Sequence, residues 1–159
     1  MIEIRRVSAD EWQLQRDVRL SALRDTPAAF ASTYEQEVAF GENEWRARAR
    51  NGLFVALDGP APVGLAAGFR DPAAAAHHRE LVSVWVAPEF RGRGIAGGLV
   101  DAVAAWARDD GARELALWVV IDNGSARASY ERAGFMSTGE RQPVTSGDPR
   151  IEERMVLAL

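Results

Sequence analysis

Apolar and polar residues alternate along several short stretches of the chain, and this alternation predicts strands. Ile2 to Val7 alternates in this way, as a strand with one buried face does. Asp58-Gly59-Pro60 lies between two later apolar runs and predicts a tight turn that makes them neighbours. The further strands are predicted over 53–57, 62–69, about 80–86, 114–120 and 151–159.

Apolar residues at three- and four-residue spacing predict helices between these strands. The first helix begins where Ser8 and Glu11 match a capping box, and it ends before Pro27. A second helix is predicted to start at Thr26 and to run through Tyr34. The remaining helices are predicted over about 44–50, 95–108 and 123–133, with extended chain resuming at 135.

The order of these elements predicts the fold class. One strand, two or three helices, a β-meander, a βαβ unit, a helix and final strands form a layered α+β or α/β arrangement. The chain has 159 residues, 47% of them hydrophobic, which suits one domain with a buried core. We therefore expect a single domain over residues 1–159.

Composition excludes several kinds of chemistry. The chain has no cysteine, and its two histidines are the adjacent pair His77 and His78, so we expect no metal site and no thiolate nucleophile. No apolar run approaches the roughly 20 residues of a membrane span, which leads us to expect a cytoplasmic protein that binds no membrane. The net charge of −4 argues against a nucleic-acid partner and weakly favours a cationic small one.

The stretch "RGRGIAG", residues 91–97, predicts an anion site. It follows a strand and opens a helix, so backbone N–H groups and the helix dipole favour negative charge there. Gly92 and Gly94 let the backbone approach phosphate oxygens closely. Arg91 and Arg93 can add charge-assisted hydrogen bonds, which suits a pyrophosphate. The alternative is a glycine-rich start of a helix with no ligand.

Two phosphate-binding motifs fit this stretch poorly. Gly92, Gly94 and Gly97 spell G-x-G-x-x-G, but the nicotinamide motif belongs to a first βα unit and expects an acidic residue about 20 residues on. Here the stretch follows a meander, and Asp122 lies too far along. A Walker P-loop requires lysine, and the chain has none.

Two segments resemble signatures of the GNAT superfamily of N-acetyltransferases. "VSVWVAPEFRGRGIAGGLV" looks like its acetyl-CoA motif, Q/R-x-x-G-x-G/A after a strand end, and "NGSARASYERAGF" resembles its second signature. The resemblance covers nearly the whole chain. It implies a central mixed, mostly antiparallel sheet of about six or seven strands, flanked by helices, with one splayed and bulged strand.

The resemblance also implies a coenzyme site. The loop would hold the pyrophosphate, and the backbone of the bulged strand would hold the pantetheine arm and the thioester oxygen. Asn123 would contact the coenzyme or cap its helix, and Tyr130 would protonate the departing thiolate; a half-buried tyrosine with no task is the alternative. The implied coenzyme-binding residues are Val84, Trp85, Val86, Arg91, Gly92, Arg93, Gly94, Ile95, Ala96, Asn123, Ala126 and Tyr130.

The general base is implied at Glu80, which matches the glutamate of the family's histone-acetylating branch. A strand glutamate among apolar neighbours would have a raised pKa, as a base near neutrality needs. A solvated glutamate at a strand start is the alternative. The branch that acetylates ribosomal proteins instead has a glutamate where this chain has Trp118, which argues against that branch's mechanism.

These residues together predict an acetyl-CoA-dependent N-acetyltransferase. Because the chain lacks cysteine, the acetyl group would pass directly to a primary amine in a ternary complex. The alternative is a non-catalytic domain that binds or senses acyl-CoA. The acceptor, a small molecule or a peptide, would enter over residues 30–37 and the last strands. Its identity stays open, and a homodimer joined through the final strand is plausible.

Overall fold

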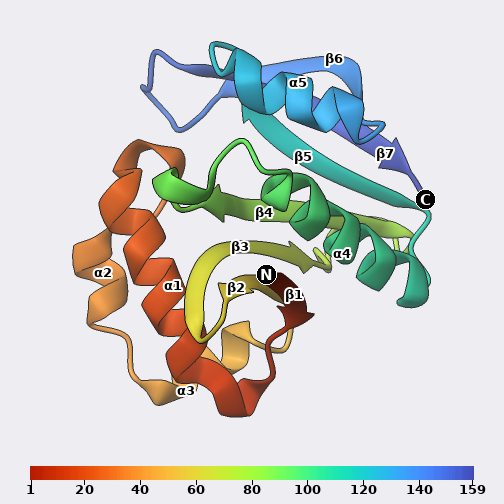
Figure 1. Ribbon diagram of the computed structural model, residues 1–159. Coiled ribbons are helices and arrows are strands. Elements are labelled where there is room, and N and C mark those ends of the chain that lie inside the picture. Colours follow the sequence, from red (N-terminus) through yellow and green to blue (C-terminus); the bar gives the residue numbers. More distant parts are fainter.

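A computed structural model describes all residues 1–159 and shows one seven-stranded mixed sheet with its helices packed against the two faces (Figure 1). The strands are β1 (Ile2–Arg6), β2 (Gly52–Asp58), β3 (Ala61–Phe69), β4 (His78–Val86), β5 (Glu114–Val120), β6 (Met136–Pro143) and β7 (Ile151–Ala158). The helices are α1 (Trp12–Asp25), α2 (Tyr34–Val38), α3 (Glu42–Arg48), α4 (Ile95–Asp109) and α5 (Gly124–Arg132).

The sheet is antiparallel except at one pair of strands. Its order is β1-β2-β3-β4-β5-β7-β6, and β4 and β5 are parallel. Their ladder is short: it begins at His78 opposite Glu114 and ends at Glu80 opposite Ala116. Beyond that pair the two strands separate, so the rest of β4 has no strand partner on that side. The expected mixed sheet with a splayed strand is thereby confirmed.

Strand β4 also carries a bulge. Trp85 pairs with Leu65 and Val82 pairs with Ala67, so two residues of β4 face one residue of β3 between these pairs. Ser83 lies in the bulge with a φ of 61°, a backbone conformation that residues with a side chain rarely adopt. The guanidinium of Arg19 on α1 donates to Ser83 Oγ at 2.8 Å. Helix α1 therefore contacts the bulge directly.

The two faces of the sheet bury different side chains because successive residues of a strand point in opposite directions. On β2, Val55 belongs to the core under α1, whereas Ala56 belongs to the core under α4. Helix α4 lies across the sheet with Leu99 and Val103 fully buried (Figure 1). Figure 1 also shows α5 against β5 and β7, on the same side as α4. The protein thus has a layer of helices on each face.

One predicted helix was wrong. The capping box predicted at Ser8 is present, with Ser8 N–H donating to Glu11 Oε1 at 3.2 Å. The helix predicted from Thr26 through Tyr34 does not form. Pro27–Ala29 forms a single 3-10 turn, and Phe30 is extended. Helix α2 starts after Thr33, because the Thr33 hydroxyl caps it by accepting from Gln36 N–H at 3.2 Å.

No helix of the structure has the length and apolar composition needed to cross a membrane. No group of three or more His, Cys, Asp or Glu side chains is placed to hold a metal ion.

Candidate active site

A cavity of about 600 Å³ lies where β4, the start of α4 and α5 meet. It lies beside the part of β4 that has left β5, and both helix layers contribute to its lining, since Thr26, Ala29 and Trp85 come from the α1 side. The structure brings most of the predicted coenzyme residues together around it: Val84, Trp85, Val86, Arg91, Gly92, Gly94, Ile95, Ala96, Asn123, Ala126 and Tyr130. Segments distant in the sequence therefore share one space.

The glycine loop has the geometry of an anion site. Gly92 and Gly94 both have a φ of 79°, a left-handed conformation that favours glycine. Gly94 is the N-cap residue of α4, so the N–H groups of the first helical turn have no partner within the helix. Those N–H groups and the positive end of the helix dipole are available to an anion in the cavity.

The two arginines of the loop behave differently. Arg91 lines the cavity, but its guanidinium is held by Asp25 Oδ2 at 2.7 Å and by the Val86 carbonyl at 2.9 Å. Arg93 lies outside the residues that line the cavity. Its guanidinium stacks over the ring of Phe90 at 5.0 Å and donates to a backbone carbonyl. Phe90 itself lines the cavity, so Arg93 lies next to the lining, and its part in coenzyme binding stays a prediction.

Tyr130 and Asn123 are both on or beside α5 and both line the cavity. Burial raises the pKa of Tyr130 to about 12, since the ionised phenolate loses solvation there. The Tyr130 ring packs edge-on against Phe135 with centroids 5.8 Å apart. Asn123 caps α5, its Oδ1 accepting from Ala126 N–H at 3.2 Å. The capping role predicted as an alternative for Asn123 is thus present.

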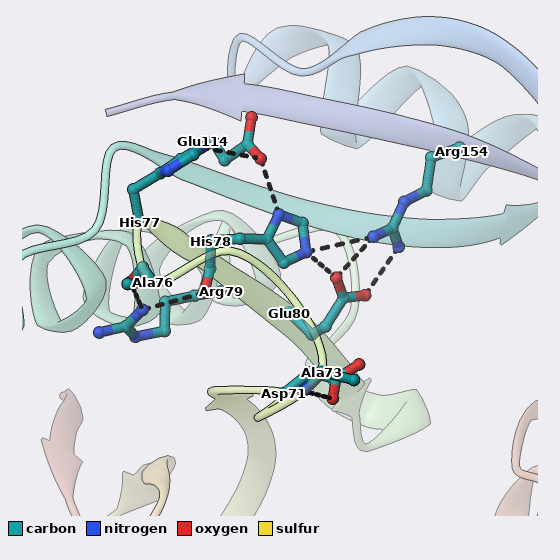
Figure 2. Close-up of polar contacts among 9 residues, drawn as sticks. All are labelled: Asp71, Ala73, Ala76, His77, His78, Arg79, Glu80, Glu114 and Arg154. Carbon is teal, nitrogen blue, oxygen red and sulfur yellow. Dashed lines mark hydrogen bonds and ion pairs between the residues drawn. The ribbon is translucent and has the colours of Figure 1, made fainter.

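Glu80 does not line this cavity. Figure 2 shows it in a chain of polar side chains that runs along the sheet from Arg154 to Glu114. Arg154 of β7 holds both of its oxygens, at 2.7 and 2.5 Å. His78 Nε2 bonds to Glu80 Oε2, and His78 Nδ1 lies 2.8 Å from Glu114 Oε1 (Figure 2).

This network sets the charge of its members. Burial alone would raise the pKa of Glu80, but hydrogen bonds from Arg154 and His78 outweigh it, and the pKa is lowered. The expectation of a raised pKa was therefore wrong. For His78, burial opposes the charged form, but hydrogen bonds to Glu80 and Glu114 outweigh it and raise the pKa. Both groups are more strongly held in their charged forms than in an unfolded chain.

Comparison with known protein families shows to which family this chain belongs. The sequence profile described as "Acetyltransferase (GNAT) family" matches residues 16–135, which include the bulged strand, the glycine loop and Tyr130. The chain belongs to the GNAT family. An uncharacterized N-acetyltransferase of Methanocaldococcus jannaschii is 32% identical over 111 residues, 68% of this chain and 47% of that protein. The chain spans about half the length of the curated relatives it matches.

Solved structures of the GNAT family share the fold. The acetyltransferase of the GNAT family from Streptococcus pneumoniae superposes with a TM-score of 0.80 at 16% identity, over 100% of both chains. The protein yncA of Salmonella typhimurium, solved with its cofactor acetyl-CoA, has a TM-score of 0.77 at 19% identity, covering 100% of this chain and 94% of that one. At such identities the likeness shows the GNAT fold and nothing finer.

Sequence reasoning missed part of this GNAT cavity. Ser125 and Ser129 could have been found, because they are one helical turn apart and adjacent to Ala126 and Tyr130 on α5. No local signal points to Asp25, which lies 66 residues from Arg91 and also accepts from the Trp85 indole at 2.9 Å. The lining residues that were not predicted are Thr26, Ala29, Phe90, Gly97, Ser125, Ser129 and Arg132.

Proposed function

We propose that this chain is an acetyl-CoA-dependent N-acetyltransferase that moves the acetyl group directly to a primary amine in a ternary complex. One observation carries the proposal: a single cavity joins the glycine loop, the unpaired edge of β4 and the Tyr130 side chain. The loop supplies donors for a pyrophosphate, the strand edge supplies donors for a thioester oxygen, and the phenol supplies a proton. A protein that only stores or senses acyl-CoA has no need of a phenol that donates a proton.

The coenzyme would be held mainly by backbone. The N–H groups of the loop and of the first turn of α4 would bind the pyrophosphate, since Arg91 is engaged with Asp25 and Arg93 faces Phe90. The backbone of Val84 to Val86 pairs with β3 on one side but has no strand partner on the β5 side, so the N–H groups that point to the β5 side are free to receive the pantetheine arm. The protein yncA of Salmonella typhimurium has acetyl-CoA as its cofactor, which supports this choice of co-substrate.

Acetyl transfer requires one proton to leave the amine and one to reach the sulfur. The amine nitrogen attacks the thioester carbon, a C–N bond forms, and the C–S bond breaks as the tetrahedral intermediate collapses. Tyr130 donates its hydroxyl proton to the departing thiolate and regains one from water. No cysteine exists to carry an acetyl-enzyme, so the transfer is direct.

Glu80 is the proposed proton acceptor, with a limited contribution. Its carboxylate is ionised at neutral pH, as a base must be, but Arg154 and His78 lower its pKa and therefore its basicity. A weakly basic carboxylate removes a proton from an ammonium group poorly. The acceptor must then arrive largely as the free amine, and the pH of the solution governs how much of it does.

Replacing Glu80 with glutamine is expected to lower kcat/KM by about tenfold, below the usual range for a well-matched base. In this variant kcat/KM should still rise from neutral to alkaline pH with the same midpoint as in the wild type. The rise reports deprotonation of the acceptor amine, since Glu80 is already ionised. Initial rates of thiol release across pH measure both quantities. Glu114→Gln, at the exposed end of the same chain of contacts, is the control. A midpoint that disappears in Glu80→Gln contradicts the low pKa.

Binding of acetyl-CoA is tested first by thermal unfolding, with NADH as the comparison ligand. At 100 times its Kd, a ligand of the native state adds about 2.7 kcal/mol of stability, so acetyl-CoA should raise the melting temperature and NADH should not. A Gly97→Ala variant sharpens the test. Gly97 lines the cavity, and an added Cβ meets no protein atom within 4 Å.

The methyl group of Gly97→Ala should therefore leave the free protein as stable as before, or more stable by up to about 1 kcal/mol, while it obstructs the coenzyme and raises its Kd at least about tenfold. Gly124→Ala is the matched control, since it also adds a methyl group in open space on a helix but lies outside the cavity lining. Equal Kd values in both variants would place acetyl-CoA elsewhere, and no shift with acetyl-CoA at all would remove the proposal.

A further inference from the structure

A second, smaller cavity lies on the face of the sheet that α1 covers. Its volume is about 160 Å³, close to that of an engineered cavity that holds one benzene. We call it the α1–α3 pocket. Its polar side chains are Gln15 and Arg19 of α1, Arg48 of α3, Asn51 just before β2, and Ser83 of β4. Its floor is formed by apolar residues of β2, β3 and β4.

The charged groups of the α1–α3 pocket do not cancel. Arg19 pairs with both oxygens of Glu37, at 2.9 and 3.0 Å, and Arg48 Nη1 donates to Glu37 Oε1 at 2.7 Å. Glu37 is fully buried, so two guanidinium groups share one carboxylate and the pocket keeps one uncompensated positive charge. Nε and Nη2 of Arg48 donate to no residue, and Phe40 stacks on its guanidinium at 4.8 Å.

Gln15 supplies an independent sign of a ligand. Its side chain is only 4% exposed, and its Oε1 has no hydrogen-bond partner in the protein. Buried polar groups are nearly always hydrogen-bonded, and an exception calls for a partner that the protein does not itself supply. Because Gln15 lines the α1–α3 pocket, this oxygen would accept from an N–H or O–H group of a molecule bound there.

The α1–α3 pocket adjoins the proposed site of transfer. Ser83 lines the pocket, and the next residue, Val84, lines the coenzyme cavity. At these residues β4 has no strand partner on the β5 side, because its ladder with β5 ends at Glu80. A molecule bound in the pocket therefore lies against the same bulge at which the acetyl group is proposed to be held.

We propose that the α1–α3 pocket binds the carboxylate end of the acceptor, so that the substrate class is amino acids with a short apolar chain; this rests on the proposed function. The carboxylate accepts from the free N–H groups of Arg48 and matches the uncompensated charge. A neighbouring N–H group donates to Gln15 Oε1, and the apolar chain covers the floor. Polyamines and other polycationic acceptors are disfavoured by the positive pocket, despite the net negative charge of the whole chain.

The first experiment measures binding without turnover. In the presence of coenzyme A, 4-methylpentanoate is expected to bind the wild-type protein in a calorimetric titration, and Arg48→Met should weaken it at least about tenfold, the loss of a charge-assisted hydrogen bond. Arg46→Met, which removes an arginine from the same helix that pairs with Asp10 and Glu42, is the control and should bind as wild type. Absence of binding to the wild type overturns the proposal.

The second experiment compares each amino acid with the amine that lacks its carboxylate: leucine with 3-methylbutylamine, and methionine with 3-(methylthio)propylamine. Wild type should show a kcat/KM at least about tenfold higher for the amino acid of a pair. Gln15→Glu places a compensating negative charge in the pocket and should abolish this preference while activity toward the carboxylate-free amines remains, a result that misfolding cannot produce. Equal preference in the wild type overturns the proposal.

The two possible failures are distinguishable. If acetyl-CoA binds and an amine is acetylated without any preference for a carboxylate, the acceptor class is wrong and the transferase function stands. If acetyl-CoA does not raise the melting temperature, the proposed function itself fails, and with it the assignment of the α1–α3 pocket to an acceptor.

Discussion

Replacing Tyr130 with phenylalanine is expected to lower kcat by about 10²- to 10⁴-fold, the usual contribution of a positioned general acid. The phenol faces the coenzyme cavity from α5, and the departing thiolate would otherwise have to take its proton from water. The ring keeps its contact with Phe135, so the Kd of acetyl-CoA and the melting temperature should be close to those of the wild type. Steady-state rates of thiol release and calorimetric titration measure the two effects separately.

The pH dependence of the wild type gives a second check on Tyr130. Burial raises its pKa to about 12, so the hydroxyl stays protonated and able to donate across the whole range in which enzymes are normally assayed. Activity should therefore not fall on the alkaline side below about pH 10, the ordinary pKa of tyrosine. Full activity in Tyr130→Phe, or an alkaline loss near neutrality that this substitution abolishes, would remove Tyr130 from the proposed mechanism.

Replacing Glu37 with glutamine is expected to lower the free energy of unfolding by about 3 kcal/mol, at the lower end of the range for breaking a buried ion pair. Glu37 is fully buried and is the only carboxylate that pairs with Arg19 and Arg48. When the charge of Glu37 is removed, the guanidinium groups of Arg19 and Arg48 face each other beside the bulge with no carboxylate between them. Arg48 is partly exposed, so water relieves some of the cost. Urea unfolding measures the difference.

Glu35→Gln is the control for Glu37→Gln, because Glu35 is an exposed residue of the same helix. The effect should also depend on pH. Burial acts to raise the pKa of Glu37, but the hydrogen bonds and charge of Arg19 outweigh it, and the pKa is lowered. Its stabilisation is then present above the ordinary pKa of glutamate, about 4.3, and is lost as the pH falls through the lower folded value. A constant difference down to strongly acid pH would contradict this origin.

Much of the fold followed from local patterns. The strand predicted over 114–120 has the same bounds in the structure, and the helix predicted from Ile95 starts at that residue. Both succeeded because alternation and helical spacing report directly which face of an element is buried. The segment after Thr26 was predicted as a helix, but it forms a single 3-10 turn at Pro27–Ala29 and irregular chain up to Thr33. Its residues permit either conformation, and the capping box at Thr33 decides where the helix starts.

The residues around the coenzyme cavity were also predicted only in part. Gly92, Gly94 and Tyr130 were expected to lie together and do. That expectation came from the family resemblance, because the glycine loop and α5 are separate elements that only the tertiary fold brings together. Arg93 and Glu80 were expected to take part and lie outside the lining. The guanidinium of Arg93 stacks on Phe90, and the carboxylate of Glu80 pairs with Arg154. Arg154 lies 74 residues from Glu80 in the sequence.

The sequence by itself determined the order of strands and helices, the glycine loop at the start of a helix and the membership of the GNAT family, because each is written in residues close together along the chain. Only the tertiary structure decided which charges are paired and where cavities form. The Asp25–Arg91 pair and the α1–α3 pocket join elements far apart in sequence. Pairing energies and cavities depend on distances in space and on burial, and no local pattern of residues records either.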